Sequence, residues 1–212
     1  MILKFKRCVD HPILFNDIND DSIIFDLGSH KGEFIDDMLR NCNHTIYSYE
    51  ANPNLYSHLI NKYNDMSNIN IYNIGIRNKQ GISKFNISPS SVASSFYGNL
   101  KNKIDVKTNT LDNEVRRLNI NKIDLLKIDV EGCEYEILTS LDEEILDIIQ
   151  QIVVEMHTCS HSDIINRKSI KNIDKKLFKA GFVPINNLYN KDQQCVYIRY
   201  VYLEEQNESK RS

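Results

Sequence analysis

The sequence lacks the features that define several classes of protein. Its 212 residues contain no apolar run of about 18 residues, so we expect no transmembrane helix. The segment Met1–Arg7 has neither a long apolar stretch nor a small-residue cleavage site, so we expect no secretory signal. Lys and Arg total 26 against 29 Asp and Glu, which gives a formal net charge of −3. This balance argues against general nucleic-acid binding.

Cysteine is sparse, and its spacing forms no recognisable framework. The chain contains Cys8, Cys42, Cys133, Cys159 and Cys195, an odd number without a C-x-x-C pair. We therefore expect reduced thiols in a cytoplasmic compartment. The segment His157–His161 reads H-x-C-x-H, but no second ligand pair stands elsewhere, so we expect no structural zinc. A G-x-S-x-G elbow is also absent, which leaves a hydrolase unsupported.

The sequence does contain a regular alternation of strand-like and helix-like segments. Apolar, β-branched runs occur at Ser22–Leu27, Thr45–Glu50, Ile69–Ile74, Ile123–Asp129 and Ile152–Met156. Helical segments are expected at Gly32–Asn41, Asn54–Met66, Leu111–Leu118, Glu134–Ile149 and Asp163–Ala180. Strands separated by single helices predict an α/β fold with a mostly parallel sheet and helices on both faces.

The C-terminal part departs from this alternation. Phe182–Asn187 and Gln194–Tyr202 are strand-like runs joined by a polar turn, which predicts an antiparallel hairpin. We expect one domain over residues 1–203, with residues 1–20 as an N-terminal extension and 204–212 as a polar tail.

One long connection, residues 86–103, mixes small hydroxyl residues with Phe96 and Tyr97. Connections longer than about 12–15 residues in a compact domain are usually functional or disordered. Two interpretations follow for this region, a lid that covers a substrate and a flexible surface loop.

Two of the apolar runs end in acidic residues and glycine. The first leads into Asp26-Leu27-Gly28-Ser29-His30-Lys31-Gly32, and the second into Asp129-Val130-Glu131-Gly132-Cys133-Glu134. Ligands of open α/β sheets bind beyond the carboxyl ends of the strands, so both segments are expected at one site. Carboxylates crowded at such a place are costly unless a metal, another cation or a transferable proton needs them.

The first of these segments favours a nucleoside cofactor. Gly28 permits a tight turn after the strand, and Glu50 at the end of the next strand can accept hydrogen bonds from both hydroxyls of a ribose. His30 stands where a dinucleotide loop needs its middle glycine. Asp26 and Glu33 would repel a pyrophosphate but attract the sulfonium and ammonium groups of S-adenosylmethionine. The loop therefore favours S-adenosylmethionine over a nicotinamide dinucleotide.

Six segments, in order, resemble the FkbM-type S-adenosylmethionine-dependent methyltransferases. They are Phe25–Phe34 (FDLGSHKGEF), Tyr49–Tyr56 (YEANPNLY), Asn73–Gly81 (NIGIRNKQG), Thr110–Asp112 (TLD), Ile123–Leu138 (IDLLKIDVEGCEYEIL) and Val153–His157 (VVEMH). One departure is His30, where the family commonly has asparagine. The resemblance implies a seven-stranded class I methyltransferase fold, Rossmann-like, and methyl transfer, usually to a hydroxyl oxygen.

The resemblance also implies roles by position. Around the methionine part and the ribose of the cofactor it places Asp26, Gly28, Ser29, His30 and Gly32. Glu50 would hold the ribose hydroxyls with Ala51 beside it, and Gly75 and Ile76 would line the adenine pocket. Facing the transferred methyl group, at the carboxyl end of the fourth strand, it places Asp129, which also borders the cofactor, and the acceptor-binding Glu131 and Glu134. At the end of the fifth strand it places Glu155 and His157. For Glu134 an alternative is a first-turn helix acid that the helix dipole favours.

These residues lead to specific expectations for the chemistry. His157 is the expected general base if its pKa lies near neutral, and Asp129 or Glu155 would orient it or take the proton. The same three residues can converge as a divalent metal site or as a metal-free cluster, and we favour the cluster, with no metal ligand. The expected partner is a small-molecule or glycan acceptor. Alternatives are a non-catalytic S-adenosylmethionine-binding module and, less favoured, a nicotinamide-dependent reductase.

Overall fold

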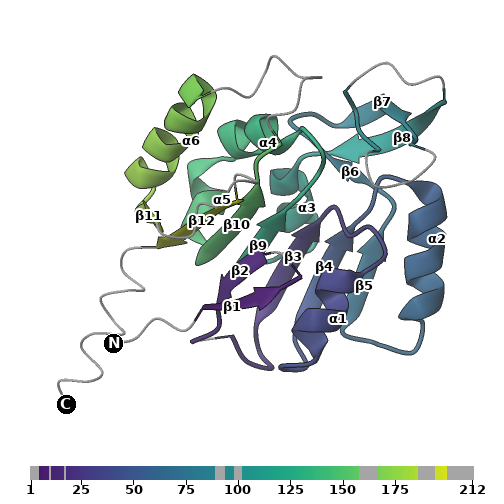
Figure 1. The fold of residues 1–212 in the computed structure, drawn as a ribbon, viewed down its shortest axis with the longest axis horizontal. Coiled ribbons are helices and arrows are strands. Elements are labelled where there is room, and N and C mark those ends of the chain that lie inside the picture. Colours follow the sequence, from purple (N-terminus) through teal and green to yellow (C-terminus); the bar gives the residue numbers. More distant parts are fainter. Residues whose placement is uncertain are drawn as a thin grey trace.

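The central element of the fold is a seven-stranded sheet in the order β11-β12-β10-β9-β3-β4-β5 (Figure 1). The computed structural model describes residues 5–9, 11–16, 18–88, 94–97, 102–157, 167–185 and 194–199. The strands are β3 (Ile23–Leu27), β4 (Thr45–Tyr49), β5 (Ile69–Tyr72), β9 (Leu125–Ile128), β10 (Gln151–Glu155), β11 (Phe182–Pro184) and β12 (Gln194–Arg199). Strands β5, β4, β3, β9 and β10 run parallel, and β12 runs antiparallel to both β10 and β11.

The sheet confirms the predicted α/β architecture, with strand bounds that shift by a few residues. Its central strands are apolar and continuous because both faces are covered, and β9 is buried along its whole length. The predicted pairing of the last two strands is also confirmed, and β12 lies between β10 and β11 rather than at the edge. The polar turn between them lies outside the described residues.

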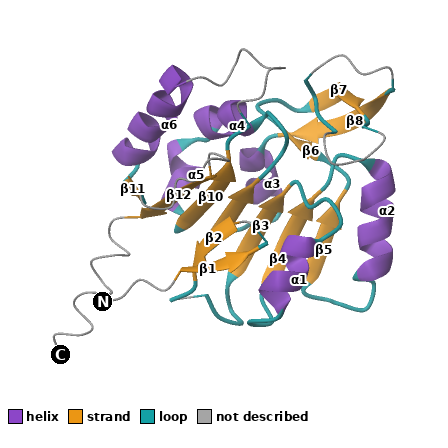
Figure 2. Cartoon of the chain, in the orientation of Figure 1, coloured by secondary structure: helices purple, strands orange, loops and turns teal. Residues whose placement is uncertain are grey.

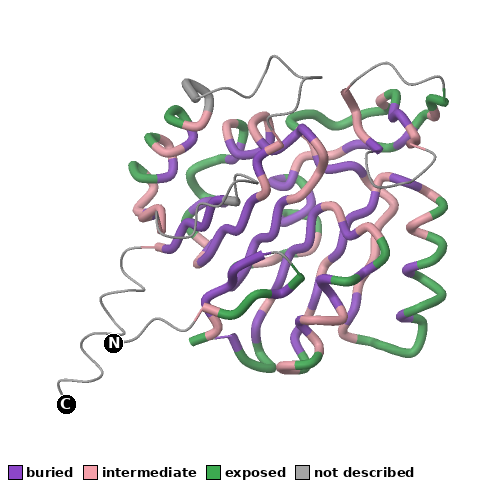
Figure 3. Tube along the Cα trace, viewed as in Figure 1, coloured by how far each residue is buried: buried purple, intermediate pink, exposed green. Residues whose placement is uncertain are grey.

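Helices cover both faces of the sheet (Figure 2). They are α1 (Glu33–Leu39), α2 (Pro53–Lys62), α3 (Leu111–Arg117), α4 (Glu134–Ser140), α5 (Glu143–Asp147) and α6 (Arg167–Lys179). Side chains of α3 to α6 pack into one apolar core, and side chains of α1 and α2 pack into the other. The chain is buried along the central strands of the seven-stranded sheet and exposed on the outer sides of α2 and α6 (Figure 3). In the part of the chain that the structure describes, no helix combines the length and apolarity needed to span a membrane.

One predicted helix is wrong. The segment Glu134–Ile149 forms two helices, because Leu141 and Asp142 are extended, with ψ of 130° and 152°. The backbone N–H of Asp142 donates a hydrogen bond to Asp112 of α3 at 2.7 Å, and the Asp142 carboxylate pairs with Arg116 at 2.5 Å. These tertiary contacts hold Asp142 at the start of α5, a position that aspartate favours.

The N-terminal extension contains an unforeseen hairpin of β1 (Phe5–Cys8) and β2 (His11–Leu14). All of β2 is buried. The buried amide of Gln151 on β10 accepts a hydrogen bond from the Leu14 N–H at 2.8 Å and donates one to the Leu14 carbonyl at 3.2 Å. Because of this two-way contact, the hairpin is fastened to the face of the sheet.

A second, three-stranded sheet lies beyond the carboxyl ends of β4 and β5 (Figure 1). It comprises β6 (Gly75–Ile76), β8 (Lys103–Asn109) and β7 (Gly81–Asn86), in that order. The predicted long connection, residues 86–103, is the link from β7 to β8. Of it, residues 89–93 and 98–101 lie outside the described residues, so the lid remains a prediction there. Ser95 pairs with Asn86 and continues the antiparallel edge.

Candidate active site

A cavity of about 370 Å³ lies where the loops after β3, β4 and β9 meet β6. Among its lining residues are the predicted cofactor residues Gly28, Ser29, His30, Glu50, Ala51, Gly75, Ile76 and Asp129. Glu131 lines it as well. The structure therefore brings these residues from four separate segments of the chain to one site.

Gly28 is the point of closest approach between two of these loops. Its φ is +85°, and a Cβ atom there would lie 1.7 Å from the carbonyl oxygen of Asp129. Glycine is therefore required both by the backbone conformation and by the space. Gly32 is not among the lining residues, and a Cβ there would lie 2.4 Å from the Tyr63 hydroxyl. It serves the packing of α1 against α2.

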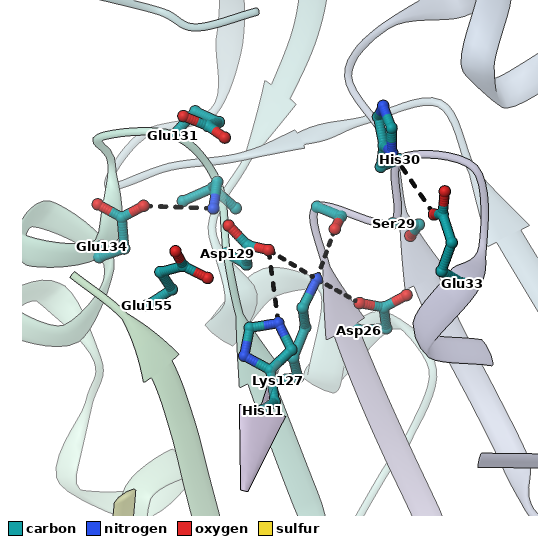
Figure 4. Close-up of polar contacts among 12 residues, drawn as sticks. His11, Asp26, Ser29, His30, Glu33, Lys127, Asp129, Glu131, Glu134 and Glu155 are labelled. Atoms are coloured by element: carbon teal, nitrogen blue, oxygen red, sulfur yellow. Dashed lines mark hydrogen bonds and ion pairs between the residues drawn. The ribbon is translucent and has the colours of Figure 1, made fainter. Parts of the chain in front are cut away.

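Asp26 does not line the cavity either. It is fully buried and lies under the cavity, where its carboxylate is 3.1 Å from the Lys127 ammonium. Lys127 donates a hydrogen bond to the Gly28 carbonyl at 2.6 Å and lies 3.6 Å from Asp129. Burial lowers the pKa of Lys127, but the charges of Asp26 and Asp129 outweigh it and raise the pKa above its ordinary value. Asp26 thus acts on the cavity through Lys127 (Figure 4).

Glu50 has the geometry expected of a ribose ligand. One carboxylate oxygen accepts a hydrogen bond from the His30 N–H at 2.9 Å, and the other accepts one from the Asn52 N–H at 2.8 Å. Each oxygen keeps a second lone pair for a ligand. Burial raises the pKa of Glu50 to about 7, although these two hydrogen bonds and Lys127 lower it.

His157 and four carboxylates form a cluster at the carboxyl ends of β9 and β10, here called the acidic cluster. Its members are Asp129, Glu131, Glu134, Glu155 and His157. Nδ1 of His157 lies 2.8 Å from Glu134 Oε1, and Nε2 lies 3.5 Å from Glu131, 3.8 Å from Asp129 and 3.9 Å from Glu155. Figure 4 shows the four carboxylates around the ends of these strands. The predicted convergence of residues from the fourth and fifth strands is therefore observed.

The acidic cluster determines the protonation of its members. Burial lowers the pKa of His157, but the hydrogen bond to Glu134 and the charges of Glu131 and Asp129 raise it to about 10. The condition under which His157 was expected to act as a base, a pKa near neutral, is therefore not met in this cluster. Burial, together with Asp129, Glu134 and Glu155, raises the pKa of Glu131 to about 7 although His157 lowers it. Burial disfavours the charge of Asp129, but Lys127 and the histidines hold its pKa well below its usual range.

His11 is a site residue that the sequence did not indicate. It begins β2, is 4% exposed, lines the cavity, and places Nε2 3.5 Å from Asp129 Oδ2 (Figure 4). Its position depends on the hairpin, for which the sequence offered no motif. Lys127 did carry a signal, because a lysine within a buried strand is rare unless it is paired.

The described part of the β7–β8 connection closes one side of the cavity. Phe96 lines the cavity and lies against Gly75, where an added Cβ would be 2.4 Å from its ring. Ser95 Oγ donates a hydrogen bond to the Glu131 carbonyl. The guanidinium of Arg77 lies 4.8 Å from the centre of the Phe96 ring and forms two hydrogen bonds with Glu136. This segment therefore touches both the cofactor residues and the loop of the acidic cluster.

Comparison with known proteins identifies the family of this chain. Residues 26–184 match the family model described as the Methyltransferase FkbM domain. The chain belongs to the FkbM methyltransferase family. Its mixed seven-stranded sheet is the class I methyltransferase fold that the resemblance implied. S-adenosylmethionine is accordingly the cofactor of this FkbM domain.

Curated relatives of the FkbM domain include two methyltransferases of different origin. "Methyltransferase 1" of Beauveria bassiana is 29% identical over 171 residues, covering 65% of this chain and 65% of that protein. The hexuronic acid methyltransferase AglP of Haloferax volcanii is 23% identical over 146 residues, covering 68% of this chain and 60% of that protein. The chain thus spans less than two thirds of the length of these relatives. Among solved structures, the fibrillarin pre-rRNA processing protein of Methanococcus jannaschii is similar, with a TM-score of 0.48 and 16% identity, covering 93% of this chain and 71% of that one.

The residues of the cavity fit this cofactor. The ring atom Nε2 of His30 is buried beside the cavity and has no hydrogen-bond partner among the described residues. The Glu50 carboxylate has free lone pairs for the ribose hydroxyls, and Asp129 offers negative charge to the sulfonium and ammonium groups. When bound, S-adenosylmethionine supplies an electrophilic methyl group.

Proposed function

We propose that this FkbM domain methylates a hydroxyl oxygen of a small molecule or a sugar. The observation that carries the proposal is the placement of two carboxylates, Asp129 and Glu131, in the wall of the cavity that also holds the cofactor residues. They can accept hydrogen bonds from an acceptor hydroxyl and orient its oxygen. Alignment of oxygen and methyl group is the main catalytic demand of methyl transfer. The name of the relative AglP, a hexuronic acid methyltransferase, supports a sugar as one class of acceptor.

The proposal divides the cavity into two sides. The cofactor side comprises Gly28, Ser29, His30, Glu50, Ala51, Gly75 and Ile76, and the acidic cluster forms the acceptor side. On the cofactor side, Glu50 would hold the ribose hydroxyls, and Ala51, Gly75 and Ile76 would contact the adenine. On the acceptor side, Asp129 and Glu131 touch the acceptor, whereas Glu134, Glu155 and His157, which do not line the cavity, shape the cluster behind them.

The segment 94–97 would cover the acceptor once it is bound. Ser94 and Phe96 line the cavity, and Ser95 is hydrogen-bonded to the backbone of Glu131. Exclusion of water at this position would strengthen the electrostatic interactions inside the cavity. This segment is the described part of the connection for which the sequence offered a lid as one of two interpretations.

The test is a screen of hydroxyl-bearing compounds with methyl-labelled S-adenosylmethionine. We expect label on the oxygen of at least one sugar or small alcohol, located by the chemical shift of the new methyl group. Asp129→Asn is expected to abolish transfer, whereas Glu144→Gln, at an exposed position of α5, should leave it unchanged. Label found only on nitrogen or carbon would contradict O-methylation, and cofactor binding without transfer to any acceptor would favour a binding module.

A further inference from the structure

The orientation of His157 is fixed by a buried carboxylate. Nδ1 of His157 lies 2.8 Å from Oε1 of Glu134, a fully buried residue. The same oxygen accepts hydrogen bonds from the backbone N–H groups of Gly132 at 3.0 Å and Val130 at 3.3 Å. A carboxylate that holds one imidazole nitrogen in this way directs the other nitrogen, and it is the usual support of a metal-binding histidine.

The free nitrogen of His157 faces three carboxylates at an unusual spacing. Its distances to Glu131, Asp129 and Glu155 are 3.5, 3.8 and 3.9 Å. A direct N–H···O hydrogen bond would be about 2.7–3.2 Å long. Two atoms bound to one ion with bonds of about 2.1 Å lie roughly 3.4 Å apart in tetrahedral geometry, and farther at wider angles. These distances lie within ion-pair range and also match the separation of ligands around a shared ion.

The distribution of charge in the acidic cluster also favours a bound cation. Four carboxylates surround one imidazole, and among the described residues the lysine near the cluster, Lys127, is already bound to Asp26 and the Gly28 carbonyl. Asp129 uses its two oxygens differently, since Oδ2 faces Lys127 and His11, whereas Oδ1 faces His157. The side of Oδ1 is thus the side where negative charge is in excess. Ligand atoms of Asp129, Glu131 and His157 all lie within 4.8 Å of one another.

We propose that Asp129, Glu131 and His157 bind one divalent transition-metal ion, with Glu134 positioning His157. One imidazole with two carboxylates suits Mn²⁺, Fe²⁺ or Zn²⁺ better than Mg²⁺ or Ca²⁺. The ion takes the Nε2 lone pair, so its binding displaces the proton from that nitrogen. This site departs from the metal-free cluster that the sequence favoured, because the sequence revealed neither the Glu134 contact nor the spacing around Nε2.

The ion would also serve the reaction, and this role rests on the proposed function. Asp129 and Glu131 line the cavity, so the oxygen of a bound acceptor can become a further ligand, which lowers the pKa of its hydroxyl. The hydroxyl proton leaves to solvent water, and the oxygen forms a bond to the methyl carbon. The carbon–sulfur bond breaks with its electron pair on sulfur, leaving S-adenosylhomocysteine.

The test measures Mn²⁺ binding to the chelator-treated full chain by electron paramagnetic resonance, without cofactor or acceptor. We expect one bound Mn²⁺ per chain and a nitrogen coupling in the echo-modulation spectrum that disappears in His157→Ala. Asp129→Asn and Glu131→Gln should each weaken binding at least tenfold. The matched controls His58→Ala and Glu144→Gln, both at exposed positions, should bind as the wild type does.

Two results would overturn the metal site. One is a folded wild-type chain that binds no Mn²⁺, and the other is binding that Asp129→Asn and Glu131→Gln leave unchanged. The near-isosteric variants Asp129→Asn and Glu131→Gln keep the test valid if His157→Ala fails to fold. Because no methyl transfer is measured, this outcome is independent of the proposed function. Mn²⁺ binding without any transfer would refute the function alone, and transfer without Mn²⁺ binding would refute the site alone.

Discussion

The cofactor side and the acceptor side of the cavity differ in how their charged groups are held. On the cofactor side, both oxygens of Glu50 accept hydrogen bonds from backbone N–H groups of neighbouring loops. On the acceptor side, Asp129, Glu131 and Glu155 surround Nε2 of His157 at 3.5–3.9 Å, without hydrogen bonds to it. The first arrangement is complete before a ligand arrives, whereas the second has an excess of negative charge. We infer that the cofactor side is a fixed binding surface and that the acceptor side is completed by what binds there.

The strongest test of this comparison removes the cation between the two sides. Lys127→Met leaves Asp26 buried without its partner, and breaking a buried pair costs about 3–5 kcal/mol of unfolding free energy. Chemical denaturation measures this loss. In the double variant Asp26→Leu with Lys127→Met, much of the stability should return. If the single and the double variant are equally unstable, the contribution of Lys127 to stability does not come from its contact with Asp26.

A somewhat smaller effect is expected at Gly28, where the two sides touch. In Gly28→Ala, the added Cβ meets the Asp129 carbonyl and the positive φ is strained, so we expect a loss of about 2–4 kcal/mol and of cofactor binding. Gly81→Ala is the matched control, because φ is also positive there but nothing lies within 4 Å of the added atom. Equal losses in the two variants would show that strain alone, and not the contact between the loops, makes Gly28 necessary.

The N-terminal hairpin should matter to the acceptor side only. Gln151→Leu leaves the Leu14 N–H and carbonyl without their partner, which costs about 1–3 kcal/mol. Because the hairpin carries His11 to Asp129, we expect slower methyl transfer with unchanged S-adenosylmethionine affinity. Calorimetry measures the cofactor affinity, and a transfer assay on the same preparation measures the rate of methyl transfer. A loss of cofactor affinity would mean that the hairpin also supports the cofactor side.

The pH dependence of cofactor binding should originate on the cofactor side. Burial raises the pKa of Glu50 to about 7, so the carboxylate is protonated below that pH. Ribose hydroxyls donate to the ionised form, and the Kd for S-adenosylmethionine should therefore rise as pH falls below 7, by up to about tenfold per unit. Titrations between pH 5.5 and 8.5 on the wild type and Glu50→Gln measure this, within a window of roughly one to two units around the pKa. If the Kd for S-adenosylmethionine depends on pH equally in both proteins, Glu50 is not the source of the pH dependence.

The two sides also differ in how far the sequence predicted them. Gly28, Glu50 and Gly75 follow strands directly, and the carboxyl ends of parallel strands meet at one edge, so their place in the cavity followed from the order of segments. The meeting of Asp129, Glu155 and His157 followed from the same rule. Whether a residue faces the cavity or a neighbouring helix did not follow from it, and Gly32, which lies against Leu59 of α2 and Tyr63, is the example.

Features that depend on long-range contacts could not be predicted from the sequence. His11 reaches Asp129 because Gln151 fastens the hairpin to the sheet, and no local pattern records that contact. The break between α4 and α5 depends on the hydrogen bond from Asp142 to Asp112 of another helix. The protonation of His157 depends on Glu134 and on carboxylates from separate segments, so the sequence could state a base role only on the condition of a pKa near neutral.

The most direct test of the account is the affinity for S-adenosylmethionine of three proteins, the wild type, Glu50→Gln and Glu131→Gln, measured by calorimetry at pH 8. Loss of hydrogen bonds to a charged acceptor costs about 1–3 kcal/mol, so Glu50→Gln should bind roughly 5- to 150-fold more weakly. Glu131→Gln should bind the cofactor within about threefold of the wild type and lose methyl transfer, because its carboxylate serves the acceptor. Equal cofactor affinity in the wild type and Glu50→Gln, or a loss centred on Glu131→Gln, would contradict the division of the cavity into these two sides.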